Sequence, residues 1–161
     1  MSTSVDAVRI RNATPQDADG LTDLLLQLGF PDFAELTRDE VGRRLQEKLE
    51  LAGAPSHTLL VAESRATFVG YAAVHWLPCL FLSGLDGYLS ELFVTPAARG
   101  HSVGTRLLGA VYGEAEKRGC TRLTLINRRD RESYERGFYA KQGWVEQPEA
   151  ARFSYVLKHK G

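Results

Sequence analysis

The chain has no excess of charge of either sign. Its 20 basic side chains balance 20 acidic ones, so the formal net charge at pH 7 is zero. Proteins that hold the phosphate backbone of nucleic acids usually carry a basic excess, which is missing here. We therefore expect neither DNA nor RNA as a partner.

Cysteine is also scarce. The two cysteines, Cys79 and Cys120, are too few for a disulfide framework or for a zinc site built from four thiolates. Free cysteine is commonly a buried, small apolar side chain, so we expect packing roles and no bound metal. Few cysteines are typical of proteins of a reducing cytosol, and the cytoplasm is the expected location.

Long apolar runs are missing as well. No stretch of about eighteen apolar residues occurs, so we expect no transmembrane helix and no membrane partner. The segment 1–6 lacks the basic start and apolar block of a signal peptide. What the chain does have is 161 residues, 43% hydrophobic and 25% charged, which is typical of one globular domain. We expect a single domain over residues 1–161.

Hydrophobic periodicity predicts alternating strands and helices. Strands are expected at 8–11, 57–63, 68–76, 88–94, 123–126, 144–146 and 152–158. Helices are expected at 15–28, 37–49, 102–118 and 130–142, and Thr37 with Glu40 forms a capping box. The predicted order is β-α-α-β-β-β-α-β-α-β-β, a mixed α/β fold with a mostly antiparallel sheet and helices on both faces.

The most informative segment is a connection from a strand to a helix after Val94. Gly100, Ser102 and Gly104 carry little or no side chain there, and Arg99 adds a positive charge. The first N–H groups of a helix lack intrahelical partners and the helix dipole adds positive potential, so such a turn can bind a phosphate. A tight connection without any ligand is the alternative.

Two well-known phosphate-binding motifs do not fit this turn. A P-loop needs Lys and then Ser or Thr after its last glycine, but Thr105 and Arg106 follow Gly104. The dinucleotide fingerprint G-x-G-x-x-G follows the first strand of a βαβ unit, and the glycines here have a different spacing. Both of these cofactor classes are therefore excluded.

The segment Val94-x-Pro96-x-x-Arg99-Gly100-x-Ser102-Val103-Gly104 resembles the acetyl-CoA-binding motif of the GNAT superfamily of N-acetyltransferases. That family's pattern, Arg/Gln-x-x-Gly-x-Gly/Ala, cradles the pyrophosphate of coenzyme A, and Ser102 replaces its middle glycine. Serine tolerates a positive φ poorly, but the replacement is harmless if position 102 is ordinary helical backbone. The resemblance implies cofactor contacts from Leu92, Phe93, Val94, Arg99, Gly100, His101, Ser102, Val103, Gly104 and Thr105.

A second match lies downstream. Phe138-Tyr139-x-x-x-Gly143-Trp144 resembles the family signature Phe-Tyr-x-x-x-Gly-Phe, whose tyrosine lies near the CoA sulfur and often protonates the departing thiolate. This implies that Tyr139 contacts the cofactor and is the general acid, since a tyrosine hydroxyl is protonated at pH 7. Packing in the core is the alternative.

The asparagine that the family often has seven residues before that tyrosine is replaced by Glu132. The nearest asparagine, Asn127, is the candidate for the same cofactor contact. Glu132 and Ser102 are thus the two departures from the family pattern.

Glu91 is the candidate base that takes a proton from the amine. On a strand of period two it is expected to share a face with Leu89 and Phe93, and a carboxylate between apolar neighbours is a better base near neutrality. A solvated or ion-paired glutamate is the alternative, and His75 is a second candidate base. The expected acceptor pocket is aromatic and polar, which suits a cationic amine, and comprises Phe30, Phe33, His75, Trp76, Tyr88 and Glu91.

The resemblance implies an enzyme that transfers an acetyl group from acetyl-CoA to a primary amine by direct attack in a ternary complex. The acceptor is expected to be a small molecule such as a polyamine or amino acid, rather than a protein, as in the diamine acetyltransferase branch. Backbone N–H groups of the strand at Phe93 and Val94 are expected to hold the oxyanion. A catalytically silent acyl-CoA-binding regulatory module is the alternative, and a homodimer is a further expectation from the family.

Overall fold

The computed structural model describes residues 7–158. They fall into two compact units with a boundary between Ile126 and Asn127, and each unit is described by itself. Within residues 7–158, no helix combines the length and the apolar character needed to cross a bilayer.

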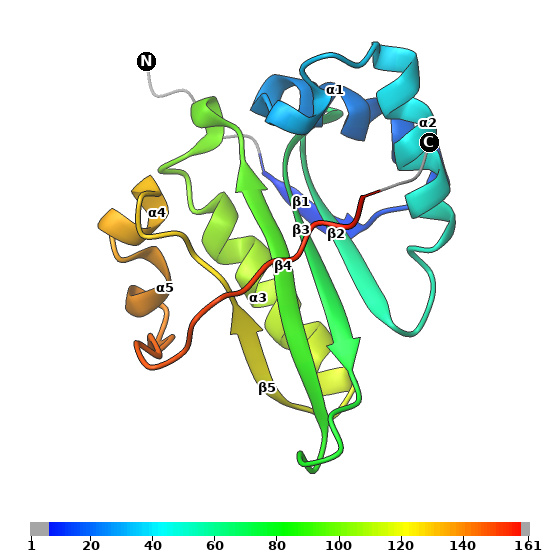
Figure 1. Ribbon diagram of the computed structural model, residues 1–161. Helices are drawn as coiled ribbons and strands as arrows, with labels where there is room; N and C mark the ends of the chain where they lie inside the picture. Colours follow the sequence, from blue (N-terminus) through cyan, green and yellow to red (C-terminus); the bar gives the residue numbers. More distant parts are fainter. Residues whose placement is uncertain (1–6, 159–161) are drawn as a thin grey trace. The chain divides into compact units, whose positions relative to one another are not determined.

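The first unit is built on a five-stranded sheet (Figure 1), with the strands in the order β1-β2-β3-β4-β5. The strands are β1 (Arg9–Asn12), β2 (His57–Ser64), β3 (Thr67–Leu77), β4 (Leu85–Val94) and β5 (Cys120–Leu125). The first four strands pair antiparallel, and β4 pairs with β5 in parallel. The mixed α/β fold expected from the sequence is confirmed.

Three helices belong to this unit: α1 (Ala18–Leu28), α2 (Arg38–Glu50) and α3 (Val103–Lys117). Short 3-10 turns, η1 (Pro15–Asp17), η2 (Pro31–Phe33) and η3 (Pro96–Ala98), lead into or out of them. Gly29 ends α1 in the left-handed conformation, and the predicted capping box of Thr37 and Glu40 starts α2. Local sequence therefore sets the helix boundaries.

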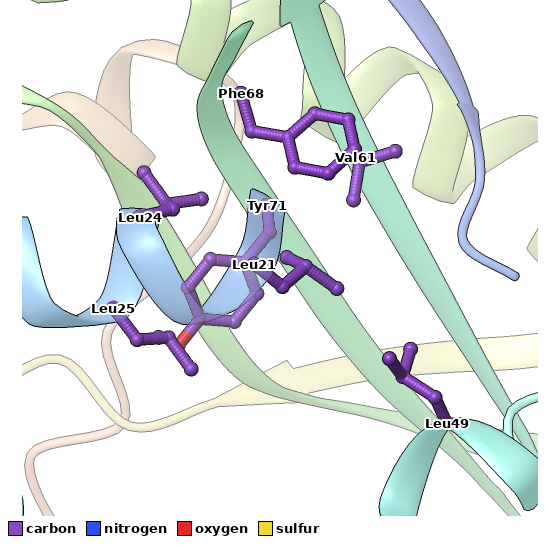
Figure 2. Close-up of a cluster of buried hydrophobic side chains, with 7 residues drawn as sticks. All are labelled: Leu21, Leu24, Leu25, Leu49, Val61, Phe68 and Tyr71. Carbon is purple, nitrogen blue, oxygen red and sulfur yellow. The ribbon is translucent and has the colours of Figure 1, made fainter. Parts of the chain in front are cut away.

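The main core lies between α1, α2 and one face of the sheet. Figure 2 shows its side chains, which are Leu21, Leu24, Leu25, Leu49, Val61, Phe68 and Tyr71. Burying an aliphatic or aromatic side chain of this size stabilises the fold by about 1.5–3 kcal/mol. The opposite face of β3 packs under α3, where a Cβ on Gly70 would lie 3.4 Å from Leu107.

One extra residue interrupts the pairing of β3 with β4. Ala73 pairs with Glu91 and Val74 pairs with Leu89, so Ser90 has no partner and forms a β-bulge. Side chains alternate between faces, and an unpaired residue shifts the alternation by one. Glu91 therefore shares a face with Phe93, as expected, while the expectation that Leu89 lies on that face is wrong.

The second unit contains two short helices, α4 (Glu132–Glu135) and α5 (Phe138–Lys141). The single helix expected at 130–142 is wrong, because Gly137 adopts φ 63° and breaks it in two. The segments 144–146 and 152–158 form no strand, so the last two predicted strands are wrong as well. A strand needs a neighbouring strand to pair with, and the described residues show no strand pairing for these two segments.

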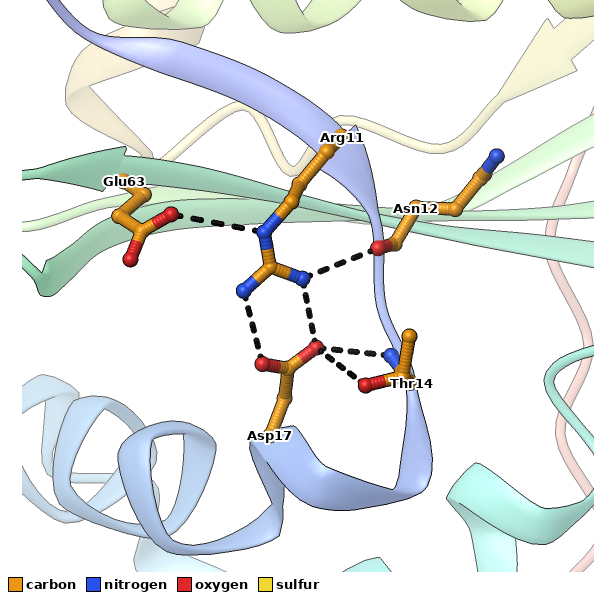
Figure 3. Close-up of polar contacts among 5 residues, drawn as sticks. All are labelled: Arg11, Asn12, Thr14, Asp17 and Glu63. Carbon is orange, nitrogen blue, oxygen red and sulfur yellow. Dashed lines mark hydrogen bonds and ion pairs between the residues drawn. The ribbon is translucent and has the colours of Figure 1, made fainter.

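An ion pair between Arg11 and Asp17 links the start of α1 to the sheet (Figure 3). Arg11 of β1 donates two hydrogen bonds to the carboxylate of Asp17, each 2.8 Å, and a weaker one of 3.4 Å to Glu63. Asp17 also accepts the backbone N–H of Thr14 at 2.7 Å. Hydrogen bonding by Arg11 lowers the pKa of Asp17, although partial burial opposes the shift.

We expect Asp17→Asn to lower the free energy of unfolding at pH 7 by about 1–3 kcal/mol, because it leaves the charge of Arg11 without its bidentate partner. Since the folded pKa of Asp17 is lowered, its contribution is present above the unfolded value of 3.8 and is lost as the pH falls through the folded pKa. Urea unfolding at pH 7 and at about pH 3 measures both effects.

Asp19→Asn is the matched control, because the side chain of Asp19 is 91% exposed and lies 3.5 Å from Arg38. It is expected to change stability by less than about 0.5 kcal/mol. Equal stability of the two variants at pH 7 would contradict the role given to Asp17.

Candidate active site

The parallel strands β4 and β5 separate part of the way along β4. Their pairing runs from Leu85 with Cys120 to Leu89 with Leu125, and β4 then continues to Val94 without β5. Beyond this point β4 is paired on one side only, by β3. The separation opens the sheet beside the second half of β4.

The N–H groups in this half of β4 point alternately to its two sides. The N–H of Thr95 donates to Val69 of β3 at 2.9 Å. By the alternation of an antiparallel ladder, Phe93 also directs its N–H to β3, whereas Leu92 and Val94 direct theirs to the side that β5 has left. On the side that β5 has left, the strand therefore offers the N–H groups of Leu92 and Val94, whereas the N–H of Phe93 is directed to β3.

The turn after β4 joins these donors to the start of α3. Gly100 has φ 78° and Ser102 has φ 61°, and α3 begins at Val103. The first helical hydrogen bond runs from Arg106 to Ser102 over 3.0 Å, so the N–H groups of Val103 and Gly104 precede it. Donors of the strand, the turn and the helix follow one another along residues 92–104.

Arg99 ties this turn to the strand end. Its Nε donates to the carbonyl of Val94 at 3.2 Å, which keeps a positive charge beside the turn. Gly100, His101 and Ser102 are all exposed. The residues expected from the sequence to contact the cofactor between 92 and 105 therefore form one continuous segment, which is exposed at 99–102, whereas the Val103 side chain is buried.

The conformation of Ser102 answers the question raised by its replacement of a glycine. Its backbone is left-handed, so the condition under which serine would be harmless does not hold. The left-handed region costs a residue with a Cβ about 1–2 kcal/mol, and the Ser102 hydroxyl makes no capping hydrogen bond in return. The turn keeps the shape that glycine would favour and stores strain.

The face of β3 and β4 under α1 carries a chain of aromatic contacts that ends at Glu91. The Tyr71 hydroxyl donates to Oε1 of Glu91 at 3.0 Å. The Tyr71 ring stacks on Phe93 with centroids 5.7 Å apart, and Phe93 meets the edge of Phe30 at 4.8 Å. Phe33 lies 6.1 Å from Phe30. Two of the expected acceptor residues, Phe30 and Phe33, thus lie on the same side as Glu91.

His75 and Tyr88 continue this face because the bulge at Ser90 brings Tyr88 opposite His75. Their rings lie 6.4 Å apart, and His57 lies 5.9 Å from His75 on the other side. Burial, and then the charge of His75, lower the pKa of His57. Within the described range, no three His, Cys, Asp or Glu side chains gather as metal ligands would.

The hydrogen bonds of Ser90 define the tautomer of His75. Ser90 Oγ donates its only hydrogen to the carbonyl of Ala73 at 3.3 Å, so it accepts from Nε2 of His75 at 3.1 Å. In the neutral imidazole Nδ1 then carries the lone pair. This contact joins the His75 ring to β4, the strand that carries Glu91.

Trp76 lies apart from the other expected acceptor residues. It is on the opposite face of β3, is only 3% exposed and donates from Nε1 to Thr58 at 3.0 Å. Arg118 covers its ring at 5.2 Å. Since neighbours in a strand face opposite ways, the pairing of Trp76 with His75 in one pocket conflicts with strand geometry, and the structure gives Trp76 a packing role.

The remaining expected residues belong to the second unit. Tyr139 of α5 meets Phe138 at 4.9 Å and Trp144 at 5.8 Å, both edge to face. Oδ1 of Asn127 accepts from the Ser133 hydroxyl at 3.1 Å. The signature residues Phe138, Tyr139 and Trp144 therefore form one aromatic cluster within this unit.

Sequence reasoning missed Tyr71. It stands in an apolar strand where phenylalanine would fill the same space, and only the hydroxyl distinguishes it. A buried tyrosine hydroxyl usually has a partner, so a tyrosine at a core position was the available signal.

Comparison with known proteins identifies the family. Residues 22–144 match the model of the Acetyltransferase (GNAT) family. The chain belongs to this family. An uncharacterised N-acetyltransferase of Bacillus subtilis is 30% identical over 82% of the chain and 89% of that protein. Glucosamine 6-phosphate N-acetyltransferase 1 of rice is 34% identical over 88% of the chain and 83% of that protein.

Solved structures show the same GNAT fold. Glucosamine-6-phosphate N-acetyltransferase of Arabidopsis thaliana superposes with a TM-score of 0.74 at 20% identity, over 95% of this chain and all of that one. An aminoglycoside acetyltransferase from a soil metagenome gives 0.75 at 17% identity, over 94% of this chain and 97% of that one. The family and its named N-acetyltransferases make this chain an acetyl-CoA-dependent acyltransferase.

We expect Ser102→Gly to raise the free energy of unfolding by about 0.5–1 kcal/mol, because glycine adopts the left-handed backbone without strain. Urea unfolding checks this, and Ser102→Ala is the control because it removes the hydroxyl but keeps the Cβ. No difference between the Gly and Ala variants would show that the turn is not strained.

Proposed function

We propose that this GNAT protein transfers the acetyl group of acetyl-CoA to the primary amine of a small molecule, by direct attack in a ternary complex. The observation that carries the proposal is the separation of β4 from β5. It leaves the N–H groups of Leu92 and Val94 without a strand partner on that side among residues 7–158. Half-buried donors without a partner are uncommon unless a ligand completes them.

The backbone N–H donors between residues 92 and 104 suit two polar parts of acetyl-CoA, its pyrophosphate and its reactive carbonyl. A pyrophosphate carries negative charge, which the N–H groups of Val103 and Gly104, the helix dipole and Arg99 all favour. Around Gly100 the space is open, since an added Cβ would meet no atom within 4 Å. Bound acetyl-CoA supplies the reactive carbonyl, and we propose the N–H groups of Leu92 and Val94 as the donors to its oxygen.

The opposite side of β4 suits the amine. Glu91 is exposed, and its carboxylate can bind an ammonium group and take up its proton, because an amine attacks only in the neutral form. The rings of Phe30 and Phe93 add faces that favour a cation. His75 is the second candidate for the proton.

Relatives point to a set of acceptors worth testing. The rice relative is named for glucosamine 6-phosphate, and one structural neighbour is named as an aminoglycoside acetyltransferase. We therefore propose that the screen should contain amino sugars beside polyamines and amino acids. The thiol released from acetyl-CoA reports turnover of each.

We expect the protein to bind acetyl-CoA with micromolar affinity in isothermal titration, and Gly104→Glu to abolish binding, because a carboxylate at the helix start repels a pyrophosphate. Gly109→Glu is the matched control on the same helix, since Gly109 is exposed and an added Cβ would meet no atom.

Equal binding by the two variants would contradict the assignment of the cofactor to this turn. Binding by the unchanged protein without turnover of any amine would favour the alternative, a silent acyl-CoA-binding regulatory module. The same titration therefore separates an enzyme from a binding protein once it is combined with the acceptor screen.

We propose Tyr139 as the acid that protonates the thiolate, from the signature that it shares with Phe138, Gly143 and Trp144. Tyr139→Phe is then expected to lower kcat by about a hundredfold with acetyl-CoA affinity nearly unchanged. Tyr134→Phe is the control within the same unit, where the hydroxyl donates to Glu146 at 2.9 Å. A Tyr139→Phe variant with full kcat would remove this role.

A further inference from the structure

Tyr71 combines a core position with a polar contact to the proposed base. It is 4% exposed and packs in the cluster of Leu21, Leu25 and Phe68 (Figure 2). A phenylalanine ring would fill this place equally well. A hydroxyl in such surroundings lowers stability unless it is hydrogen bonded, and its partner here is the carboxylate of Glu91 at 3.0 Å.

The contact joins two neighbouring strands on one face. Tyr71 pairs with Phe93, and Glu91 is two residues from Phe93 toward the bulge, so Tyr71 and Glu91 are diagonal neighbours across β3 and β4. The stacked Phe93 ring, 5.7 Å away, limits the rotation of the Tyr71 ring. The hydroxyl is therefore held in place by packing, whereas the exposed Glu91 side chain depends on Tyr71 for its orientation.

We propose that Tyr71 is a positioning residue for Glu91, holding the carboxylate by Oε1 so that Oε2 is presented to the acceptor amine. Among residues 7–158, Tyr71 is the only hydrogen-bond partner of the Glu91 side chain. A carboxylate without this contact would sample several rotamers, and few of them would bring an oxygen to the amine. This inference rests on the proposed function of Glu91 as the base.

The hydrogen bond also keeps its direction over the working range of pH. Burial raises the pKa of Tyr71 far above its usual value, and the charge of Glu91 and the hydrogen bond to it add to the rise. Tyr71 is thus the donor and the carboxylate the acceptor.

Tyr71→Phe tests the inference because it keeps the ring and removes only the hydroxyl. We expect kcat for the amine to fall about tenfold, with acetyl-CoA affinity and thermal stability nearly unchanged. Tyr112→Phe, on α3, is the control and should change neither kcat nor the affinity for acetyl-CoA.

Other titratable side chains of the strands, among them His57, His75 and Tyr88, also lie on this face. The same substitution made in a Glu91→Gln background separates them from the proposed pair. Without the carboxylate, Tyr71→Phe should cause no further loss of kcat.

An equal loss of kcat in both backgrounds would overturn the inference, because Tyr71 would then act through the fold and not through Glu91. Full kcat in Glu91→Gln would overturn both the inference and the role of Glu91 as base. Acetyl transfer by the unchanged protein would still stand in that case, so the two failures are distinguishable.

Discussion

A strand directs its N–H groups to both sides, and β4 has a neighbour on both sides only as far as Leu89. Because β3 continues to hold the strand beyond that residue, the backbone stays in place while the donors of Leu92 and Val94 lose their partner side. Such donors lower stability unless something completes them. The turn at 99–102 and the start of α3 come next in the chain. The backbone N–H groups that lack a strand or helix partner therefore lie in one segment, residues 92–104.

The bulge at Ser90 separates a part of β4 that packs in the core from a part that carries the accessible Glu91. Before it, Leu89 is buried and Tyr88 lies opposite His75; after it, Glu91 and Phe93 lie beside Tyr71. Without the extra residue, Leu89 and Glu91 would share a face, and an apolar side chain would stand where the polar ones now gather. One serine therefore lets β4 supply a buried core position and an accessible carboxylate within three residues.

The packing under α1 stabilises the fold and also supports the candidate site. The core around Tyr71 holds the sheet against α1 and α2, and the Arg11–Asp17 ion pair fixes the turn from which α1 begins. Strain is confined to tight turns: Arg65 and Ala66 take positive φ in the two-residue turn between β2 and β3, and Ser102 takes it beside the helix start. The packing of the core thus offsets the backbone strain of the left-handed turn at Ser102.

The sequence by itself determined the features that depend on near neighbours. The ends of α1 and α2 followed from Gly29 and from Thr37 with Glu40, and the turn between β4 and α3 followed from the small residues after Val94. Only the tertiary structure decided the face of Leu89, the burial of Trp76, the partner of the Tyr71 hydroxyl and the absence of strands at 144–146 and 152–158. Helix ends are set by hydrogen bonds over three or four residues, whereas strand register, bulges and cross-strand partners are set by residues far away in the chain.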